Sequence, residues 1–349
     1  MIVSILVFLV IIGVIVISHE GGHFLIARVN GIRVQEFTVG VGPALWKRKK
    51  GDTVFALRLL PFGGACIFEG MYDDEEETIN DEHSYRNAGV WSRIATGVAG
   101  PVANFLLGYL LALIVTAFSV WSFPVVAGFT EDSAAQAAGL AEGDTILSMN
   151  GKRIHMAGEV TLMSQLNRGE TVELIVERDG AKREISFTPR YSAEEDRYYM
   201  GLYVGKAGSV DGIRVLPYAW YQEKYYFDLT FTSLKMLVHG GLTLDDFAGP
   251  VGMVKIVDDT YESVKPYGLP SVVLTLLELT VLLTVNLGVM NLLPIPGLDG
   301  GRLLFALIEV FRGKPVPRDK EGYVHLAGMI ALVAFMVVVL FNDIGKFIG

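Results

Sequence analysis

Cysteine is almost absent from this sequence, since Cys66 is the only one among 349 residues. A single cysteine excludes any disulfide within the chain and leaves the redox compartment open. Charge is also sparse, because Asp, Glu, Lys and Arg make up only 19% of the residues, whereas 51% are hydrophobic. The formal net charge of −9 is unfavourable for a surface that binds nucleic acid. The composition therefore indicates a membrane protein rather than a nucleic-acid-binding protein.

The hydrophobic residues are concentrated in four segments that are long enough to cross a bilayer, which takes about 20 residues. These segments lie near 2–17, 94–123, 269–293 and 326–344. The first segment could also be a secretory signal peptide, but it lacks a basic region before it and a small-residue cleavage site after it. We therefore expect four transmembrane helices.

Lysine and arginine are scarce near both ends of the chain and gather in two segments between the apolar ones. The positive-inside rule places these two segments in the cytoplasm. Both termini and the long stretch near 124–268 then lie outside, although an acidic run at 73–77 offsets part of the first cluster. The basic residues are Lys47, Arg48, Lys49 and Lys50 in the first segment, and Arg302, Arg312, Lys314, Arg318 and Lys320 in the second.

Residues 32–70 are typical of β-strands, because "VQEFTVGVG" and "DTVFALRLLPFGGACIF" are rich in β-forming residues and punctuated by Gly and Pro. Their apolar content is high for a cytoplasmic loop. One interpretation is a β-hairpin that dips toward the membrane, where its backbone must be buried in protein or line a cavity. The alternative is an ordinary cytoplasmic β-sheet.

Residues 124–190 have the pattern of a compact α+β unit. The run "SAAQAAGLAEGDTILSMNGKRI" predicts a short helix that stops at Gly139, and then a strand between turn signals. "ETVELIVERDGAKREISFTP" alternates like a hairpin that turns at Asp179 and Gly180. The unit resembles a PDZ domain of the circularly permuted bacterial kind, and PDZ domains bind extended peptides at a sheet edge. A spacer without a ligand is the alternative.

Residues 217–240 predict an amphipathic helix that is rich in aromatic side chains. Aromatic residues are common at membrane surfaces, so this helix could lie at the outer surface of the bilayer. A helix packed on the PDZ-like unit fits the sequence equally well.

The first apolar segment ends in the motif H-E-x-x-H, formed by His19, Glu20 and His23. Positions four apart share one face of a helix, so the two imidazoles can bind one metal ion. Glu20 then projects beside the ion, where it can take a proton from water. Ionisable side chains in a spanning helix are unfavourable unless they have a function such as metal binding. A polar helix end that faces water is the alternative.

A catalytic zinc ion takes three protein ligands and keeps one open position. No third ligand follows the histidines closely, so we expect it on another apolar segment. Residues 286–302, "NLGVMNLLPIPGLDGGR", place asparagines, helix-breaking prolines and Asp299 within apolar sequence. Asp299 is the predicted third ligand, because two imidazoles and one carboxylate suit zinc. The alternative is an aspartate that only caps a loop.

Taken together, H-E-x-x-H in the first apolar segment, "NLLPIPGLDGG" near a later one and the PDZ-like insert resemble the site-2 protease family of intramembrane zinc metalloproteases. "GPVANF" at 100–105 and "AGPVGMV" at 248–254 are similar to the bacterial regulator-of-sigma-E protease branch. The enteric members carry two PDZ domains, whereas this chain has room for one. The family also often has a bulky residue where Gly21 stands.

The resemblance implies roles for individual residues. His19, His23 and Asp299 would hold Zn²⁺, and Glu20 would be the catalytic base. Asn104 lies where the family has a polar residue close to the active site, and two further asparagines match residues that handle the substrate backbone. The expected substrate-binding residues are thus Asn104, Asn286 and Asn291.

The predicted fold is a polytopic α-helical membrane protein with about four transmembrane helices, a membrane-associated β-hairpin region and an inserted extracytoplasmic PDZ-like α+β domain. The expected segments are the first transmembrane helix 1–31, a cytoplasmic loop with the hairpin 32–93, the second transmembrane helix 94–123, the PDZ-like domain 124–190, an extracytoplasmic linker with the amphipathic helix 191–268, the third transmembrane helix with its broken end 269–301, a cytoplasmic loop 302–325 and the fourth transmembrane helix 326–349.

The expected function is an intramembrane zinc metalloprotease of the bacterial inner membrane, with its active site toward the cytoplasm. By the resemblance, it would cut transmembrane segments of already trimmed membrane proteins, such as anti-sigma factors or remnant signal peptides. Its partners would be these substrates, membrane lipid and a peptide C-terminus at the PDZ-like unit, with no nucleic acid. Two alternatives are a catalytically silent PDZ scaffold, which has no need of Glu20, and a metal transporter, which has no need of a PDZ-like insert.

Overall fold

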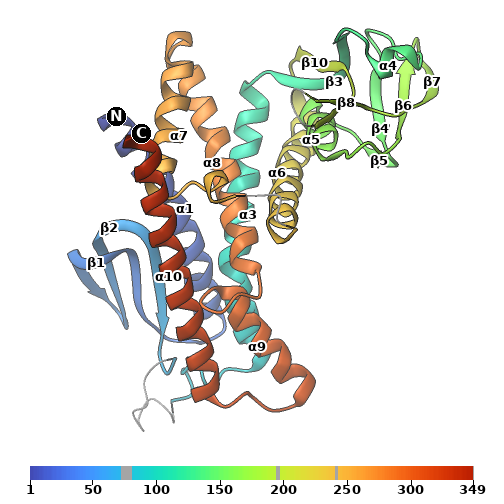
Figure 1. Cartoon of the computed structure of the whole chain (residues 1–349). Helices are drawn as coiled ribbons and strands as arrows, with labels where there is room; N and C mark the ends of the chain where they lie inside the picture. Colours follow the sequence, from blue (N-terminus) through green and yellow to red (C-terminus); the bar gives the residue numbers. More distant parts are fainter. Residues whose placement is uncertain (72–80, 194–196, 240–242, 349) are drawn as a thin grey trace. The chain divides into compact units, whose positions relative to one another are not determined.

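The computed structural model describes residues 1–71, 81–193, 197–239 and 243–348 (Figure 1). The chain divides into two compact units. One contains residues 1–111 and 230–349, and the other contains residues 112–229.

Four helices of the described chain are long and apolar enough to cross a membrane, as predicted. These helices carry apolar side chains on their exposed sides as well as on their buried sides. In α1, for example, Leu6, Val10 and Ile17 are exposed, whereas Ile11 and Ile15 are buried. A helix that is apolar on all sides suits a lipid environment. The four are α1 (Ile2–Val29), α3 (Val90–Phe118), α8 (Leu269–Leu292) and α10 (Arg318–Ile348).

Short helices join the long ones, and one of them lies where a loop was expected. Residues 302–325 were predicted as a loop, but Asp299–Arg312 forms helix α9. An acidic residue, Asp299, lies in its first turn, as is common at the start of a helix. Gly313, in the left-handed conformation (φ 68°), ends it, as glycine often does. The basic residues of this segment hid its amphipathic pattern. The other elements of this unit are the 3₁₀ turns η2 (Leu244–Asp246) and η3 (Lys265–Tyr267) and helix α7 (Pro250–Val264).

Helix α7 ties the ends of two long helices together. The Met1 ammonium group lies 2.9 Å from the Asp258 carboxylate, to which the Ser4 hydroxyl also donates. On the other side, the Gly252 N–H donates to the buried Asp343 carboxylate of α10 at 2.7 Å. Both termini of the chain therefore lie at the same end of this unit (Figure 1).

Residues 32–70 form strands, as predicted. Strand β1 (Val34–Lys50) pairs antiparallel with β2 (Thr53–Phe68), and the sheet packs beside α1 (Figure 1). Both strands bend, since residues 36–39 pair with 54–57 and also with 64–67. The segment of β2 around Gly64 is thereby brought to α1.

The second unit contains the PDZ-like fold, whose bounds are wider than the predicted 124–190. Its main sheet has the order β10-β3-β4-β6-β7, and Leu202–Gly208 at the far end of the segment pairs with Trp121–Phe129 at its start. That pairing joins distant segments, so no local pattern signalled it. The elements are β3 (Trp121–Phe129), α4 (Ala134–Ala137), β4 (Thr145–Met149), β5 (Lys152–Arg153), α5 (Ala157–Leu166), β6 (Val172–Arg178), β7 (Ala181–Phe187), β8 (Arg190–Ser192), β9 (Arg197–Tyr199) and β10 (Leu202–Gly208).

The helix expected at 217–240 is α6 (Val215–Val238), preceded by η1 (Gly212–Arg214). Its first half packs on the PDZ-like unit, which was one of the two alternatives. The Tyr221 ring stacks on His155 with centroids 3.8 Å apart, and the Tyr218 ring meets Trp121 edge-on at 5.1 Å.

An ion pair between the buried Asp144 and the partly exposed Arg178 stabilises the PDZ-like unit and gives a first prediction. Asp144 is fully buried and accepts hydrogen bonds from Arg178 at 2.6 and 2.7 Å, which hold the pKa of Asp144 below its usual value. Replacing Asp144 by Asn should destabilise the unit, because the partly exposed Arg178 guanidinium loses the charged partner that holds it against the buried carboxylate position. Hydrogen exchange of β4 and β6 in the full chain measures this loss.

The pH dependence follows from the lowered pKa. The ionised form stabilises the fold above the unfolded pKa of about 3.9, and this stabilisation is lost as the pH falls through the folded value. Protection in the parent chain should therefore fall in acid, whereas Asp144→Asn should lack that fall. Asp179→Asn, at the exposed neighbouring turn, is the control and should behave like the parent.

Candidate metal centre

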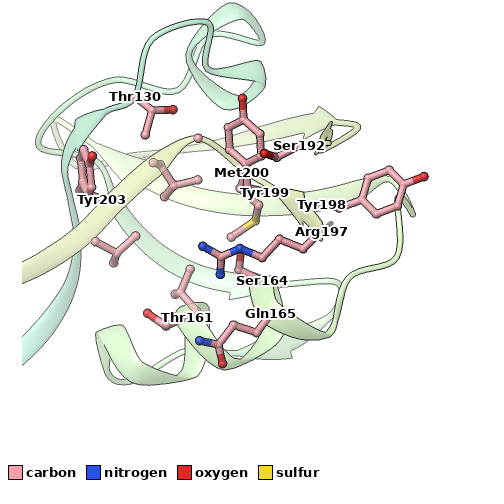
Figure 2. A pocket seen from close by; sticks show the side chains of 14 residues that line it. Thr130, Thr161, Ser164, Gln165, Ser192, Arg197, Tyr198, Tyr199, Met200 and Tyr203 are labelled. Carbon is pink, nitrogen blue, oxygen red and sulfur yellow. The ribbon is translucent and has the colours of Figure 1, made fainter. Parts of the chain in front are cut away.

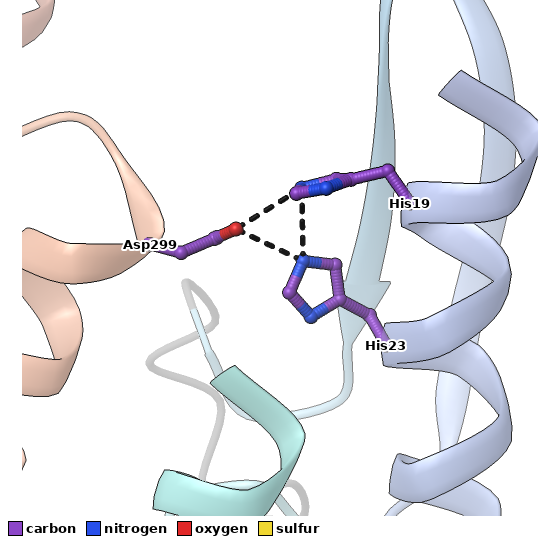
Figure 3. Close-up of side chains that lie close together, drawn as sticks. All are labelled: His19, His23 and Asp299. Carbon is purple, nitrogen blue, oxygen red and sulfur yellow. Dashed lines mark hydrogen bonds and ion pairs between the residues drawn. The ribbon is translucent and has the colours of Figure 1, made fainter. Parts of the chain in front are cut away.

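Three predicted site residues converge on one point, although Asp299 is 280 positions away from His19 in the sequence. The Nε2 atoms of His19 and His23 lie 3.0 and 3.1 Å from Oδ2 of Asp299. The two Nε2 atoms lie 3.3 Å from each other. Figure 3 shows both rings projecting from successive turns of α1 toward the carboxylate at the start of α9.

This triangle has the size of one face of a zinc tetrahedron. With bonds of about 2.0–2.1 Å, a tetrahedral zinc ion separates its ligand atoms by roughly 3.3 Å. The three atoms are close to that spacing, and both histidines are buried. Among the described residues, His19, His23 and Asp299 form the group that could hold a metal ion.

The outer nitrogens of both rings are held by α3. His23 Nδ1 lies 2.7 Å from the Thr96 carbonyl oxygen, so it must carry the proton and donate. His19 Nδ1 lies 3.2 Å from the carboxamide of the fully buried Asn104. A 180° rotation of that amide directs Oδ1, which otherwise has no partner, to accept from His19 Nδ1–H.

These hydrogen bonds fix which nitrogen of each imidazole carries the proton, and this shows whether the three residues can bind a metal ion. With its proton on Nδ1, a neutral His23 has only a lone pair on Nε2, and that lone pair faces a carboxylate oxygen. With its proton on Nδ1, His19 likewise has only a lone pair on Nε2, and this lone pair faces the same carboxylate oxygen. Three lone pairs that converge without a proton repel one another unless a cation lies among them. The donor set therefore fits Zn²⁺, with each imidazole oriented by a second partner as metal-binding histidines usually are.

Glycines hold Asp299 in place where α8 ends. The chain leaves α8 at Leu292, and α9 begins at Asp299. A Cβ at Gly300 would lie 2.1 Å from the Leu293 carbonyl oxygen, so the helix start folds tightly against the preceding loop. The Gly297 N–H also donates to Nδ1 of His325 on α10 at 3.1 Å. The loop before Asp299 is thus fixed from two sides.

Glu20 is buried beside the triad, on the side of α1 that faces β2. A Cβ added to Gly64 would lie 2.8 Å from Glu20 Cγ, so the edge of the sheet contacts this side chain. Its carboxylate has no hydrogen bond to any residue in the described part of the chain. It is therefore available to a water molecule or substrate.

The three predicted substrate-binding asparagines behave differently. Asn104 contacts His19 directly, as described above. Asn286 and Asn291 lie half-buried on α8, and neither carboxamide is hydrogen-bonded to a described residue. The structure thus gives Asn104 a contact with a candidate ligand and leaves the role of the other two as a prediction.

Sequence reasoning missed Gly100, Gly22 and the Thr96 carbonyl. A Cβ at Gly100 would lie 2.3 Å from His23 Nε2, and one at Gly22 would lie 2.3 Å from the Ala99 carbonyl oxygen. These glycines let α1 and α3 approach closely enough for α3 to contact both rings. The motif "GPVANF" contains Gly100 and was the available signal, but its contact is visible only in three dimensions.

Replacing Gly100 by Ala gives a second prediction. The new methyl group would overlap the His23 ring, so the ring must rotate and zinc retention should fall by at least about tenfold. Gly21→Ala is the matched control, because a Cβ at Gly21 has no atom within 4 Å. Zinc content of the purified chains after challenge with a chelator measures both. Equal retention in the two variants would contradict the close approach.

A second candidate site lies within the PDZ-like unit (Figure 2). A cavity of about 450 Å³ separates α5 from β10. Thr161, Ser164 and Gln165 line it from the helix, and Leu202 and Val204 line it from the strand. Because β10 forms an edge of the main sheet, an extended peptide could pair with it here.

Known proteins resemble this chain over almost its whole length. The model of peptidase family M50 matches residues 7–335. The zinc metalloprotease RasP of Geobacillus kaustophilus is 31% identical, over 99% of this chain and 98% of the relative. The regulator of sigma-W protease RasP of Bacillus subtilis is 30% identical, over 98% of each.

The PDZ domain of an SdrC-like protein from Listeria monocytogenes matches 24% of this chain and 86% of its own length, at 14% identity and a TM-score of 0.21. A likeness this weak carries no argument. The family match rests on the full-length comparisons, and the relatives are named as zinc metalloproteases. The chain therefore belongs to peptidase family M50, the site-2 protease family of zinc metalloproteases.

Proposed function

We propose that this multi-pass membrane protein cuts peptide bonds within transmembrane segments, with His19, His23 and Asp299 holding the zinc ion and Glu20 acting as the base. The observation that carries the proposal is the convergence of two imidazole nitrogens and one carboxylate oxygen within 3.3 Å of one another, next to a buried glutamate. The histidines belong to a helix long and apolar enough to span a bilayer.

When bound, the zinc ion supplies a Lewis acid that polarises a peptide carbonyl and lowers the pKa of water to about 7. Glu20 accepts a proton from the attacking water and passes it to the leaving amine. Thr96 and Asn104 hold the two imidazoles in the tautomer that presents Nε2 to the ion.

The substrate must reach this site in an extended form, because the carbonyls of a helix are shielded. The segment of β2 around Gly64 contacts Glu20, so a peptide that adds to this edge would run past the proposed base. Asn286 and Asn291, which are without partners among the described residues, would bond the amides freed from the substrate helix.

The distribution of basic residues supports an active site toward the cytoplasm and a PDZ-like unit outside. The relative named as a regulator of sigma-W protease supports membrane regulators of sigma factors as substrates, after an outer domain has been removed. The cavity beside β10 would bind the carboxyl terminus exposed by that first cut.

Cleavage of a model transmembrane peptide by the purified chain, with and without zinc, tests the proposal. Zinc-dependent cleavage within the apolar segment is expected. Peptide capture without cleavage would favour a silent scaffold, and zinc flux across proteoliposomes without cleavage would favour a transporter. Either result would overturn the proposed function.

Removing the PDZ-like unit gives a third prediction. Because β10 pairs with β3, the deletion must run from 121 to 208, with a Gly/Ser bridge in its place. The variant should retain zinc and should cut substrates whose outer domain is still attached, which the parent chain rejects. Cleavage of trimmed and untrimmed substrates in the same detergent measures the change.

A variant that still rejects untrimmed substrates, while it cuts trimmed ones normally, would place the filter elsewhere, with α6 the next candidate. Ser164→Trp, which fills the cavity, distinguishes peptide binding from exclusion by size, since only peptide binding requires an open cavity. Arg168→Trp, exposed beyond the end of α5, is its control.

A further inference from the structure

The sheet formed by β1 and β2 changes chemical character from one end to the other. Residues 44–50 pair with 53–58 and form one outer edge of the sheet, which we call the outer strand. Residues 64–67 form the opposite edge, because 36–39 lie between them and 54–57. The whole outer strand is exposed.

One end of the sheet is apolar on its surface. Arg58 at this end is paired within the sheet, because its guanidinium donates to the Glu36 carboxylate at 2.6 Å and to the Gly42 carbonyl oxygen at 2.9 Å. Aliphatic and aromatic side chains are otherwise exposed here, as they would be in lipid rather than water. They are Val41, Leu45, Trp46, Leu57, Leu59 and Leu60.

The other end of the outer strand is basic. Lys47, Arg48, Lys49 and Lys50 follow Trp46 directly and lead into the turn at Gly51 and Asp52. None of the four makes an ion pair with a residue in the described part of the chain. Their positive charge is concentrated in a chain whose formal net charge is −9.

The apolar and basic side chains are separated along the strand axis, and not between the two faces of the sheet. Successive side chains of a strand point to opposite faces, so both faces are apolar near Leu45 and Trp46, and both are basic from Lys47 onward. A surface that docks a protein would carry its apolar residues on one face. A change along the strand axis, with a tryptophan at the boundary, is the pattern of a structure that crosses from lipid into water.

The apolar end of this sheet fits the membrane-dipping hairpin considered from the sequence, and we propose that the basic run of the outer strand binds anionic phospholipid headgroups. Phosphate oxygens accept the hydrogen bonds that lysine and arginine donate, and a negative surface attracts such a run. The opposite edge contacts Glu20 through Gly64, so the headgroups hold the sheet at a fixed depth beside the metal centre. The inference rests on membrane location and not on proteolysis, so it can fail independently of the proposed function.

A nitroxide spin label on Asp52→Cys, in the turn next to the basic run, tests the proposal in the full chain. Labelling is selective because Cys66 is buried, and burial together with the nearby Glu20 raises the pKa of its thiol. The chain is placed in nanodiscs of phosphatidylcholine, alone or with about one third phosphatidylglycerol. The immobilised fraction of the spectrum should rise about twofold with the anionic lipid, and high salt should reverse the rise.

Two double variants make the result specific. Arg48→Gln with Lys49→Gln should abolish the lipid-dependent change, whereas Lys182→Gln with Arg183→Gln, exposed on β7, removes the same charges and should preserve it. Thermal unfolding in detergent confirms that each variant is folded. Equal spectra in the two lipids would overturn the proposal, as would a change that survives the first double variant or disappears in the second. A response to acidic peptides in phosphatidylcholine alone would indicate a protein partner instead.

Discussion

Replacing Glu20 by Gln is expected to lower cleavage of a transmembrane peptide by about a thousand-fold while zinc content stays unchanged. Gln has the size of Glu, so it fits the buried position against Gly64. It cannot accept the proton of the attacking water, and that step is the role proposed for Glu20. Because the side chain is not one of the three converging groups, the proposed ligand set remains complete.

Turnover and metal content must be measured on the same purified sample, because loss of the fold would lower both. Glu173→Gln on the exposed face of β6 is the matched control and should cleave at the parent rate. If Glu20→Gln also turns over at the parent rate, another residue must be the base.

Replacing Asp299 by Ala should weaken zinc binding by more than about a hundred-fold, because it removes a direct ligand rather than a supporting group. The two imidazoles would remain oriented by Thr96 and Asn104, so the variant should still bind zinc weakly. Competition with a chelator of known affinity gives the ratio of dissociation constants directly. Cleavage at a saturating zinc concentration should also fall, since the zinc ion would lack its third protein ligand.

Asp52→Ala removes an exposed carboxylate from the turn between β1 and β2 and serves as the control. Unchanged zinc affinity in Asp299→Ala would show that the third ligand lies elsewhere. Such a result would leave the close approach of His19 and His23 intact, because both residues belong to α1.

The parts of the centre that could be predicted from the sequence are those set by local geometry. Helical spacing brings His19 and His23 to one face, and an aspartate after a proline-interrupted apolar helix stood out by its chemistry alone. The hydrogen bond from His23 to the Thr96 carbonyl could not be predicted in this way, because a backbone acceptor has no residue type to signal it. The close contact at Gly100 depends on how α1 and α3 cross, which is a property of packing.

The fold shows the same division between local and distant signals. The four long helices and the turn at Asp179 follow from hydropathy and turn residues. Strand β10 was assigned to a linker, because its pairing with β3 joins residues about 80 positions apart and leaves no periodic signal of its own. Helix α9 was not predicted, because the charges on its exposed side made its sequence resemble that of a loop.

The close approach of α1 and α3 restricts how the length of this chain can vary during evolution. One inserted residue in a helix turns everything beyond it by about 100°. An insertion between Thr96 and Asn104 would therefore separate the two groups that hold the imidazoles, and it would bring a side chain to the place of Gly100. Insertions in the turn at Gly51 and Asp52 or at Asp179 face no such restriction, because these residues are exposed. Relatives that retain the metal centre should thus differ in length in their loops and keep these stretches of α1 and α3 free of gaps.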